Sequence, residues 1–267
     1  MTNKVVPLAE AAALVRSGQT LALGGMTLYR RPVAFVYELL RRAREGAPRD
    51  LTLVCFTAAY ESDLLIGAGL VRRVRSCYFG FEIFGFAPMF TDASQRGTIE
   101  VMEESEASLI SGLRATLAKV GFMPGRAWVG TDMLRLRPDV RLVRDPYSDE
   151  ELVAFPAIPI DVSVIHALQA DPLGNATLGG NIAVDPEIVL AAKTVIITAE
   201  EIVPPNTLTQ VDIVSPMVTA VAQAPRGAWP TSCHPLYPVA GGEIMRYLEA
   251  CGHGAFNDYL NERRSTL

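Results

Sequence analysis

The stretch that decides the fold is residues 161–176, which read DVSVIHALQADPLGNA. Its first ten residues are mostly apolar and rich in β-branched side chains, and the turn formers DPLGN follow at once. This pattern predicts a buried strand that runs directly into a tight polar loop. In open α/β sheets, ligands bind just beyond the carboxyl ends of the strands, so we expect a binding site at this loop.

The same alternation of apolar runs and helical stripes recurs along the chain. It predicts helices at 7–17, 32–44, 63–68, 105–119 and 186–193, and strands at 20–23, 51–56, 71–79, 98–102, from 162 onward and 194–198. Nearly continuous apolar strands separated by helices are typical of a mainly parallel open sheet covered by helices on both faces. We find no repeat, low-complexity segment or linker, so the sequence predicts a single α/β domain over residues 1–267.

Two segments depart from this alternation. Residues 81–90, FEIFGFAPMF, are aromatic, lack a period and contain Gly and Pro, which is typical of a loop packed by its own side chains. Residues 124–149 are interrupted by Gly, Asp and Pro, so we expect a long excursion from the sheet there.

Composition excludes several classes of function. The chain has 267 residues, 49% of them hydrophobic, and a net charge of -5, which gives nucleic-acid binding no electrostatic support. No apolar run reaches the roughly 18 residues that a membrane-spanning helix needs. The N-terminal run carries Glu10 and Arg16 at helical spacing and is read as an amphipathic helix, not as a signal peptide. We therefore expect a cytoplasmic protein that does not enter membranes.

The four cysteines are scattered through the sequence: Cys55, Cys77, Cys233 and Cys251. None of them has a neighbour at CxxC or CxxxH spacing, so the sequence indicates neither a zinc site nor a disulfide framework. Reduced thiols are the expectation. The neighbours Cys233 and His234 point in different directions along an extended chain, so we expect no joint chemistry from them.

Short blocks occur in a fixed order between about residues 5 and 237. They are LIGAGLV (65–71) with Tyr78 and Gly80, GLRA (112–115), FMP (122–124), GTD (130–132), DPY (145–147), the run at 161–176, AEEIV (199–203) and GAWPT (227–231). In order and spacing they resemble the A (α) subunit of heteromeric family I CoA-transferases, nearest to the glutaconate CoA-transferase type. Such agreement is rarely reached by chance matches of short motifs.

The resemblance implies that the chain is half of an enzyme. Members of this type work as A/B heterodimers or heterotetramers, with the active site at the subunit interface and the nucleophilic glutamate in a Ser-Glu-Asn-Gly context of the B subunit. This tetrapeptide is absent here. We therefore expect a B-subunit partner and, as substrate, the CoA thioester of a short unsaturated dicarboxylic acid of the glutaconyl-CoA type. No metal is implied, and no cofactor except the coenzyme A of the substrate.

Residues 22–26, ALGGM, resemble the family's Gly-x-Gly-Gly-Phe turn, whose N–H groups help to stabilise an oxyanion. Aligned N–H donors at Gly24 and Gly25 would lower a barrier by roughly 3 kcal/mol. Ala22 and Met26 replace the family's first Gly and its Phe. The alternative is a strand-to-helix turn that needs Gly only for its conformation.

Two charged groups are further candidates. Arg30 and Arg31 suit a carboxylate or a CoA phosphate, unless they are solvated arginines at a helix start. Glu106 belongs to an acidic cluster with Glu100, Glu103 and Glu104. It is a catalytic candidate if the resemblance extends to the ring-cleaving CoA hydrolases of the superfamily. Stabilisation of the following helix is the alternative, above all for Glu103 and Glu104.

The aromatic segment and the polar loop supply the remaining candidates. Glu82 is a lone carboxylate among aromatic side chains, which is unusual away from a site. Phe81 and Phe84 either line an acyl pocket or fill the core. Gly174 and Asn175 either contact a ligand or partner or serve turn chemistry alone. His166, on the apolar run, is expected to be a core histidine bonded to a neighbouring carbonyl.

Other functions stay open from the sequence. Within the superfamily, one relative decarboxylates 3-methylglutaconyl-CoA and another hydrolytically opens a ring of a steroid-derived CoA ester. Because the deciding residue belongs to the B subunit, a decarboxylase or a hydrolase is the alternative to a transferase. A different class, an effector-binding domain, would bring a basic DNA-binding module, which we do not find. A non-catalytic scaffold for a B subunit is the last alternative.

Overall fold

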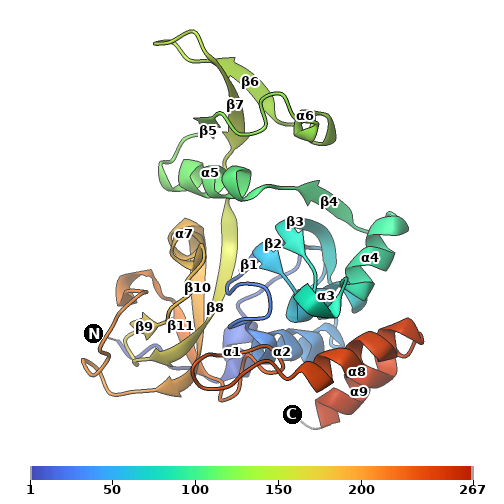
Figure 1. The fold of residues 1–267 in the computed structure, drawn as a ribbon. Helices are drawn as coiled ribbons and strands as arrows, with labels where there is room; N and C mark the ends of the chain where they lie inside the picture. The colour runs from blue at the N-terminus through green and yellow to red at the C-terminus, as the bar shows by residue number, and fades with distance from the viewer. Residues whose placement is uncertain (1, 266–267) are drawn as a thin grey trace.

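A central sheet of eight strands organises the chain in the computed structural model, which describes residues 2–265 (Figure 1). Its strands are β1 (Thr20–Leu23), β2 (Leu51–Ala58), β3 (Val71–Phe79), β4 (Glu100–Glu103), β8 (Ile160–Ala170), β9 (Ala176–Thr177), β10 (Ala192–Ile202) and β11 (Ala220–Gln223). The order is β11-β10-β8-β1-β2-β3-β4 with every neighbouring pair parallel, and β9 lies antiparallel beside β8. The expected α/β class with a mainly parallel sheet is confirmed. Residues 1, 266 and 267 of the expected domain lie outside the described residues.

Helices cover both faces of this sheet (Figure 1). One face packs against α1 (Leu8–Ala12), α2 (Val33–Ala43), α3 (Tyr60–Gly67), α4 (Pro88–Gln95), α8 (Gly241–Gly252) and α9 (Phe256–Ser265), the other against α5 (Glu106–Leu117) and α7 (Asp185–Ala191). Alternate side chains of β1 enter the two cores, Leu21 and Leu23 on the first face and Ala22 on the second. No helix within residues 2–265 combines the length and apolar character needed to cross a membrane.

The aromatic segment 81–90 is more ordered than the loop that the sequence predicts. It contains a 3₁₀ helix, η1 (Glu82–Phe84), and α4 begins at Pro88. Asp63 of α3 accepts hydrogen bonds from the backbone N–H groups of Met89 and Phe90, at 3.2 and 2.7 Å, and so caps α4. Burial raises the pKa of Asp63 to about 7. The capping carboxylate lies 26 and 27 residues before the N–H groups that it accepts from, a distance over which local sequence patterns give no signal.

The excursion expected over residues 124–149 is a folded unit. Residues 122–156, here called the extension, form the antiparallel strands β5 (Phe122–Gly125), β6 (Arg141–Arg144) and β7 (Glu151–Pro156) in the order β5-β7-β6, with α6 (Met133–Leu136) between β5 and β6. The unit stands apart from the main sheet beyond α5 (Figure 1). It has a small core of its own, formed by Trp128, Val140, Val153 and Phe155.

Candidate functional site

The loop that follows β1, residues 24–31, leaves the carboxyl end of a strand in the middle of the sheet. We call it the β1 loop. The Gly24 N–H donates to the Val164 carbonyl at 3.0 Å, and the Gly25 N–H donates to the two carboxylate oxygens of Asp185 at 3.0 and 3.2 Å. Both N–H groups are therefore used within the chain. For either N–H to bind an oxyanion, its present hydrogen bond would have to open, to the Val164 carbonyl for Gly24 and to Asp185 for Gly25.

Tight packing explains why this turn contains two glycines. A Cβ on Gly24 would lie 2.4 Å from Ile165 Cδ1 and 2.7 Å from Asp185 Oδ1. Gly25 has a φ of +85°, and a Cβ there would lie 2.6 Å from the carbonyl oxygens of both Tyr29 and Arg30. These contacts support the second alternative given by the sequence, a turn that requires glycine for its conformation.

Arg30 is completely buried at the end of the β1 loop. Its guanidinium forms an ion pair with Asp185 at 2.7 Å and donates to the carbonyls of His166 at 2.7 Å and Asn181 at 3.1 Å. The interpretation as a solvated arginine is wrong, because the side chain is buried and its partners lie on β8, on α7 and in the loop before α7. The pairing also means that this charge is neutralised inside the protein.

Arg31 is buried in the same way on the other side of the loop. It forms an ion pair with Glu61 at 2.6 Å and donates to the carbonyls of Gly25 and Thr57, each at 2.9 Å. Glu61 lies in the first turn of α3, directly after β2. Arg31 is thus not solvated either, and the two arginines brace the β1 loop from opposite sides.

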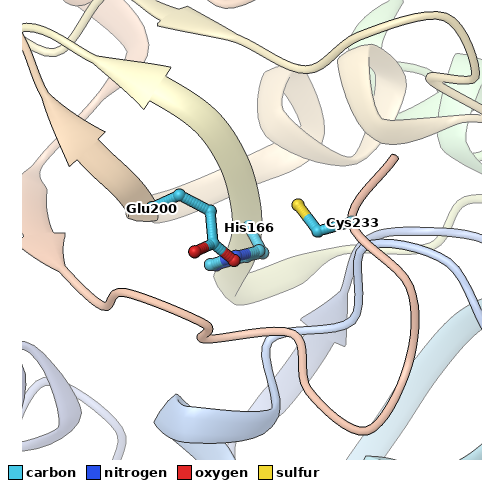
Figure 2. Close-up of side chains that lie close together, drawn as sticks. All are labelled: His166, Glu200 and Cys233. Atoms are coloured by element: carbon cyan, nitrogen blue, oxygen red, sulfur yellow. The ribbon is translucent and has the colours of Figure 1, made fainter. Parts of the chain in front are cut away.

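A second cluster, here called the His166 centre, lies beside the β1 loop and consists of His166, Thr198, Glu200, Cys233 and Tyr237. Figure 2 shows three of them, His166, Glu200 and Cys233. His166 Nδ1 lies 2.9 Å from Thr198 Oγ1, and Nε2 lies 2.9 Å from Glu200 Oε1. The Tyr237 hydroxyl donates to the same carboxylate oxygen. The Cys233 sulfur lies within 4.8 Å of the ligand atoms of His166 and Glu200.

The environment of the His166 centre fixes its charges. Burial lowers the pKa of His166, against the smaller opposing effect of Glu200, so the imidazole is neutral at pH 7. Burial opposes ionisation of Glu200, but hydrogen bonds from His166 and Tyr237 outweigh it and hold its pKa below the usual value. Burial raises the pKa of Cys233 to about 12, so this is a thiol at neutral pH.

Sequence reasoning missed most of this centre. It expected His166 to be buried and bonded to a carbonyl; the residue is buried, but its ring contacts the side chains of Thr198 and Glu200. The pairing of the strands explains the contact: His166 on β8 lies opposite Thr198 on β10, and Glu200 follows two residues later on the same face of β10. A prediction of this strand register would have placed Glu200 near His166. Cys233 lies 67 residues after His166 in the sequence, and no local sequence pattern predicts that the two side chains are close.

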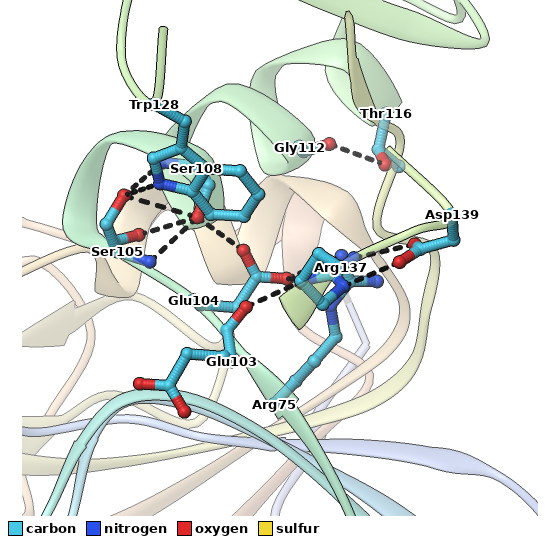
Figure 3. Close-up of polar contacts among 10 residues, drawn as sticks. All are labelled: Arg75, Glu103, Glu104, Ser105, Ser108, Gly112, Thr116, Trp128, Arg137 and Asp139. Carbon is cyan, nitrogen blue, oxygen red and sulfur yellow. Dashed lines mark hydrogen bonds and ion pairs between the residues drawn. The ribbon is translucent and has the colours of Figure 1, made fainter. Parts of the chain in front are cut away.

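The acidic cluster on β4 and just after it contains one buried carboxylate, that of Glu104 (Figure 3). Glu104 accepts ion pairs from Arg75 at 2.7 Å and Arg137 at 2.8 Å, and the Ser108 hydroxyl donates to it. The helix cap expected from Glu103 and Glu104 is instead the Ser105 side chain, which accepts from the Ser108 N–H at 3.3 Å. Glu106 is exposed in the first turn of α5.

Arg137 links the extension to the sheet, since it bonds Glu104 and also pairs with Asp139 at 2.8 Å. Arg137→Ala should lower the free energy of unfolding by about 2 kcal/mol, because Glu104 would keep only one of its two cations. Amide hydrogen exchange within residues 122–156 should rise with it. Arg144→Ala, which breaks a solvent-exposed pair with Asp149, should cost about 0.5 kcal/mol or less. Equal effects of the two changes would contradict this role of Arg137.

The aromatic candidates divide between core and surface. Phe81 is fully buried, with its ring 5.8 Å from that of Tyr247, and Phe84 packs partly buried against the same core. Glu82 is exposed and has a φ of +54°, so its carboxylate does not lie in an apolar pocket. The outward-facing apolar side chains of this segment are Ile83 and Phe86, which are 93% and 85% exposed.

Gly174 and Asn175 form the turn after β8. Asp171 Oδ1 accepts hydrogen bonds from the N–H groups of Leu173, Gly174 and Asn175, each at 2.9 Å. The Asn175 amide donates to Asp171 Oδ2 at 2.7 Å and accepts from the Ser215 N–H at 2.9 Å. The polar groups of this loop therefore stabilise the turn itself and the adjacent segment at Ser215. Gly174 adopts a φ of +103°, which favours glycine.

Comparison with known proteins places this fold among a defined set of enzymes. The family model described as Coenzyme A transferase matches residues 5–222. The chain is 35% identical to the A subunit of the 3-oxoadipate CoA-transferase of Pseudomonas knackmussii, covering 84% of this chain and 79% of that one. It is 33% identical to the cholesterol ring-cleaving hydrolase IpdA subunit of Rhodococcus jostii, covering 85% and 79%. It spans only 56% of an uncharacterized protein of Archaeoglobus fulgidus, at 32% identity.

Solved structures agree with this result. The decarboxylase AibA/AibB matches with a TM-score of 0.91 and 28% identity, over 99% of this chain and all (100%) of that one. Glutaconate CoA-transferase of Acidaminococcus fermentans matches with a TM-score of 0.90 and 29% identity, over 99% and 89%. The agreement therefore includes the extension as well as the main sheet.

Proposed function

Because the chain belongs to the coenzyme A transferase family, we propose that it is the A subunit of a two-subunit enzyme that acts on the CoA thioester of a short dicarboxylic acid, of the glutaconyl-CoA type. The observation that carries the proposal is the end-to-end structural match to glutaconate CoA-transferase. Relatives named as A subunits support a B-subunit partner. A cytoplasmic location, and a reaction that needs no cofactor except the coenzyme A of its substrate, belong to the same proposal.

The division of labour follows from what this chain contains. It lacks the Ser-Glu-Asn-Gly tetrapeptide, so in this proposal the partner supplies the nucleophile. The β1 loop, with Arg30 and Arg31 paired internally, provides a rigid wall and not a mobile anion-binding arm. Glu106 is exposed in the first turn of α5, whereas Glu104 is buried and held by two arginines. Glu106 is the residue of this chain that we propose to meet the substrate or partner.

Decarboxylation is the second candidate, and the match to AibA/AibB favours it. The test uses this chain with the B subunit that co-purifies with it, incubated with glutaconyl-CoA and with 3-methylglutaconyl-CoA, with and without acetate. Mass spectrometry then follows the acyl group. Acetate-dependent loss of the acyl group from CoA supports transfer, and acetate-independent loss indicates hydrolysis, as in the IpdA relative. A surviving thioester that has lost carbon dioxide makes the enzyme a decarboxylase.

Glu106→Gln tests whether this chain takes part in turnover. In the assembled complex, a loss of about 100-fold in kcat/KM corresponds to about 2.7 kcal/mol of transition-state stabilisation and assigns Glu106 a role in the chemistry. The matched control is Glu100→Gln, which alters another exposed glutamate of the same acidic cluster, paired with Arg73 at the surface. If both complexes keep activity within a few-fold of the unchanged enzyme, the role of Glu106 is refuted, and the scaffold alternative gains support.

A further inference from the structure

Three side chains that ligate metals in proteins converge in the His166 centre from three separate segments. His166 lies on β8, Glu200 on β10, and Cys233 in the segment that follows β11. One ligand atom from each lies within 4.8 Å of the others, and Figure 2 shows the Glu200 carboxylate beside the His166 ring, with Cys233 close by. His166 and Cys233 are fully buried, and the Glu200 side chain is 8% exposed. This position inside the protein distinguishes the cluster from a solvated group of acids.

The geometry points to a zinc site: we propose that His166 Nε2, a Glu200 carboxylate oxygen and Cys233 Sγ bind one Zn²⁺ ion. With zinc–ligand bonds of about 2.0 to 2.3 Å, the donor atoms of a tetrahedral site lie about 3.3 to 3.8 Å apart. The separation of 2.9 Å between His166 and Glu200 must open slightly, and the sulfur must approach slightly. A fourth coordination position is left to water, as in other zinc sites with three protein ligands.

The ligand types select the metal. A thiolate and an imidazole nitrogen suit zinc and other late first-row metals, whereas magnesium and calcium require oxygen ligands. Zinc also has no geometric preference from its d electrons, so it tolerates one sulfur, one nitrogen and one oxygen at unequal bond lengths. The CxxC spacing by which such sites are found in sequences is absent, because the ligands come from positions separated by 34 and 33 residues.

Charge balance supports the ion. Within residues 2–265, no lysine or arginine side chain forms an ion pair with Glu200. Its carboxylate contacts His166 Nε2, the Tyr237 hydroxyl and the Arg226 N–H, and the nearby Arg30 is neutralised by Asp185. One Zn²⁺ together with a carboxylate, a thiolate and a neutral imidazole has zero net charge, and the Cys233 proton leaves to solvent when the metal binds.

The surrounding groups already orient the three ligands. Thr198 Oγ1 lies 2.9 Å from Nδ1 of His166 and can accept a hydrogen bond from it, so metal binding would shift the imidazole proton from Nε2 to Nδ1 and leave the Nε2 lone pair for the ion. The Arg226 N–H and the Tyr237 hydroxyl donate to the two oxygens of Glu200. The Cys233 N–H donates to the Tyr237 carbonyl at 3.0 Å. An ion held here would tie the segment after β11 to β8 and β10, beside the β1 loop.

Cobalt replaces zinc as a spectroscopic probe in the test. The untagged chain is treated with a chelator, kept reduced, and titrated with Co²⁺. We expect one equivalent to bind with visible absorption typical of tetrahedral cobalt and with a thiolate-to-cobalt charge-transfer band, both abolished by one equivalent of Zn²⁺. Absence of the charge-transfer band in the wild-type chain overturns the proposal without any variant.

Variants identify the ligands. Cys233→Ser should lose the charge-transfer band and weaken cobalt binding at least about 10-fold, in the range seen for the loss of metal-site groups. Cys251→Ser is the matched control, since Cys251 is another buried cysteine, on α8, outside the cluster. Zn²⁺ should raise the Tm of the wild-type and Cys251→Ser chains but not that of Cys233→Ser. An unchanged band in Cys233→Ser, or equal Tm shifts in all three, contradicts the assignment.

Discussion

Replacing Glu61 by Gln is expected to lower the free energy of unfolding by about 3 to 5 kcal/mol. Glu61 and Arg31 are both completely buried, and their side chains meet at 2.6 Å. Gln keeps the shape of the side chain but removes its charge, so the Arg31 guanidinium would remain buried without a counterion. Urea unfolding followed by circular dichroism measures the loss.

A surface ion pair supplies the matched control. Glu38→Gln removes the same charge from a pair with Arg41, whose side chain is 53% exposed, and should cost about 0.5 kcal/mol or less. If Glu61→Gln and Glu38→Gln lowered the free energy of unfolding by similar amounts, the buried Glu61–Arg31 pair would contribute no more to stability than a surface pair. That result would also weaken the interpretation of the β1 loop as a rigid wall.

Gly25→Ala is the second change with a large expected effect. The new methyl group would meet two backbone carbonyl oxygens at 2.6 Å, which cannot swing away as a side chain can. The positive φ adds about 1 kcal/mol, and overpacking adds about 1 to 3 kcal/mol more. We expect a loss of about 2 to 4 kcal/mol in the free energy of unfolding, measured by urea unfolding.

Gly69→Ala separates the two contributions. Gly69 has a similar φ of +72°, but nothing lies within 4 Å of the position that a Cβ would take. This variant should lose only the conformational part, about 1 kcal/mol. If Gly25→Ala lost no more than Gly69→Ala, the close approach of the Tyr29 and Arg30 carbonyls would not be what requires glycine at this turn.

The sheet was predictable because its strands are locally apolar. The strands Thr20–Leu23 and Val71–Phe79 begin and end where the sequence predicts, and the parallel arrangement follows from the alternation with helices. The family resemblance, carried by blocks spread over the chain, is confirmed by the Coenzyme A transferase model. The first helix is shorter than predicted and ends at Ala12, whereas residues 7–17 were expected to be helical.

The interior of the candidate site was less predictable, since its partners lie far apart along the chain. Arg30 meets Asp185 across 155 residues and Arg31 meets Glu61 across 30, so the sequence leaves both arginines without a visible counterion. Among the glutamates after β4, the charge pattern does not distinguish Glu104 from Glu106. Only the approach of Arg75 and Arg137 makes Glu104 the buried member of the cluster.

The position of β1 between β8 and β2 has a consequence for biosynthesis. β1 pairs with β2 soon after both leave the ribosome, but its other edge waits for β8, whose Val162 pairs with Leu21 about 140 residues later. Until then a growing chain exposes an unpaired apolar strand edge, the kind of surface on which nascent proteins aggregate. Truncated chains that stop before residue 160 should therefore be captured by chaperones or precipitate, and preparations of the protein should depend on synthesis of the whole sheet.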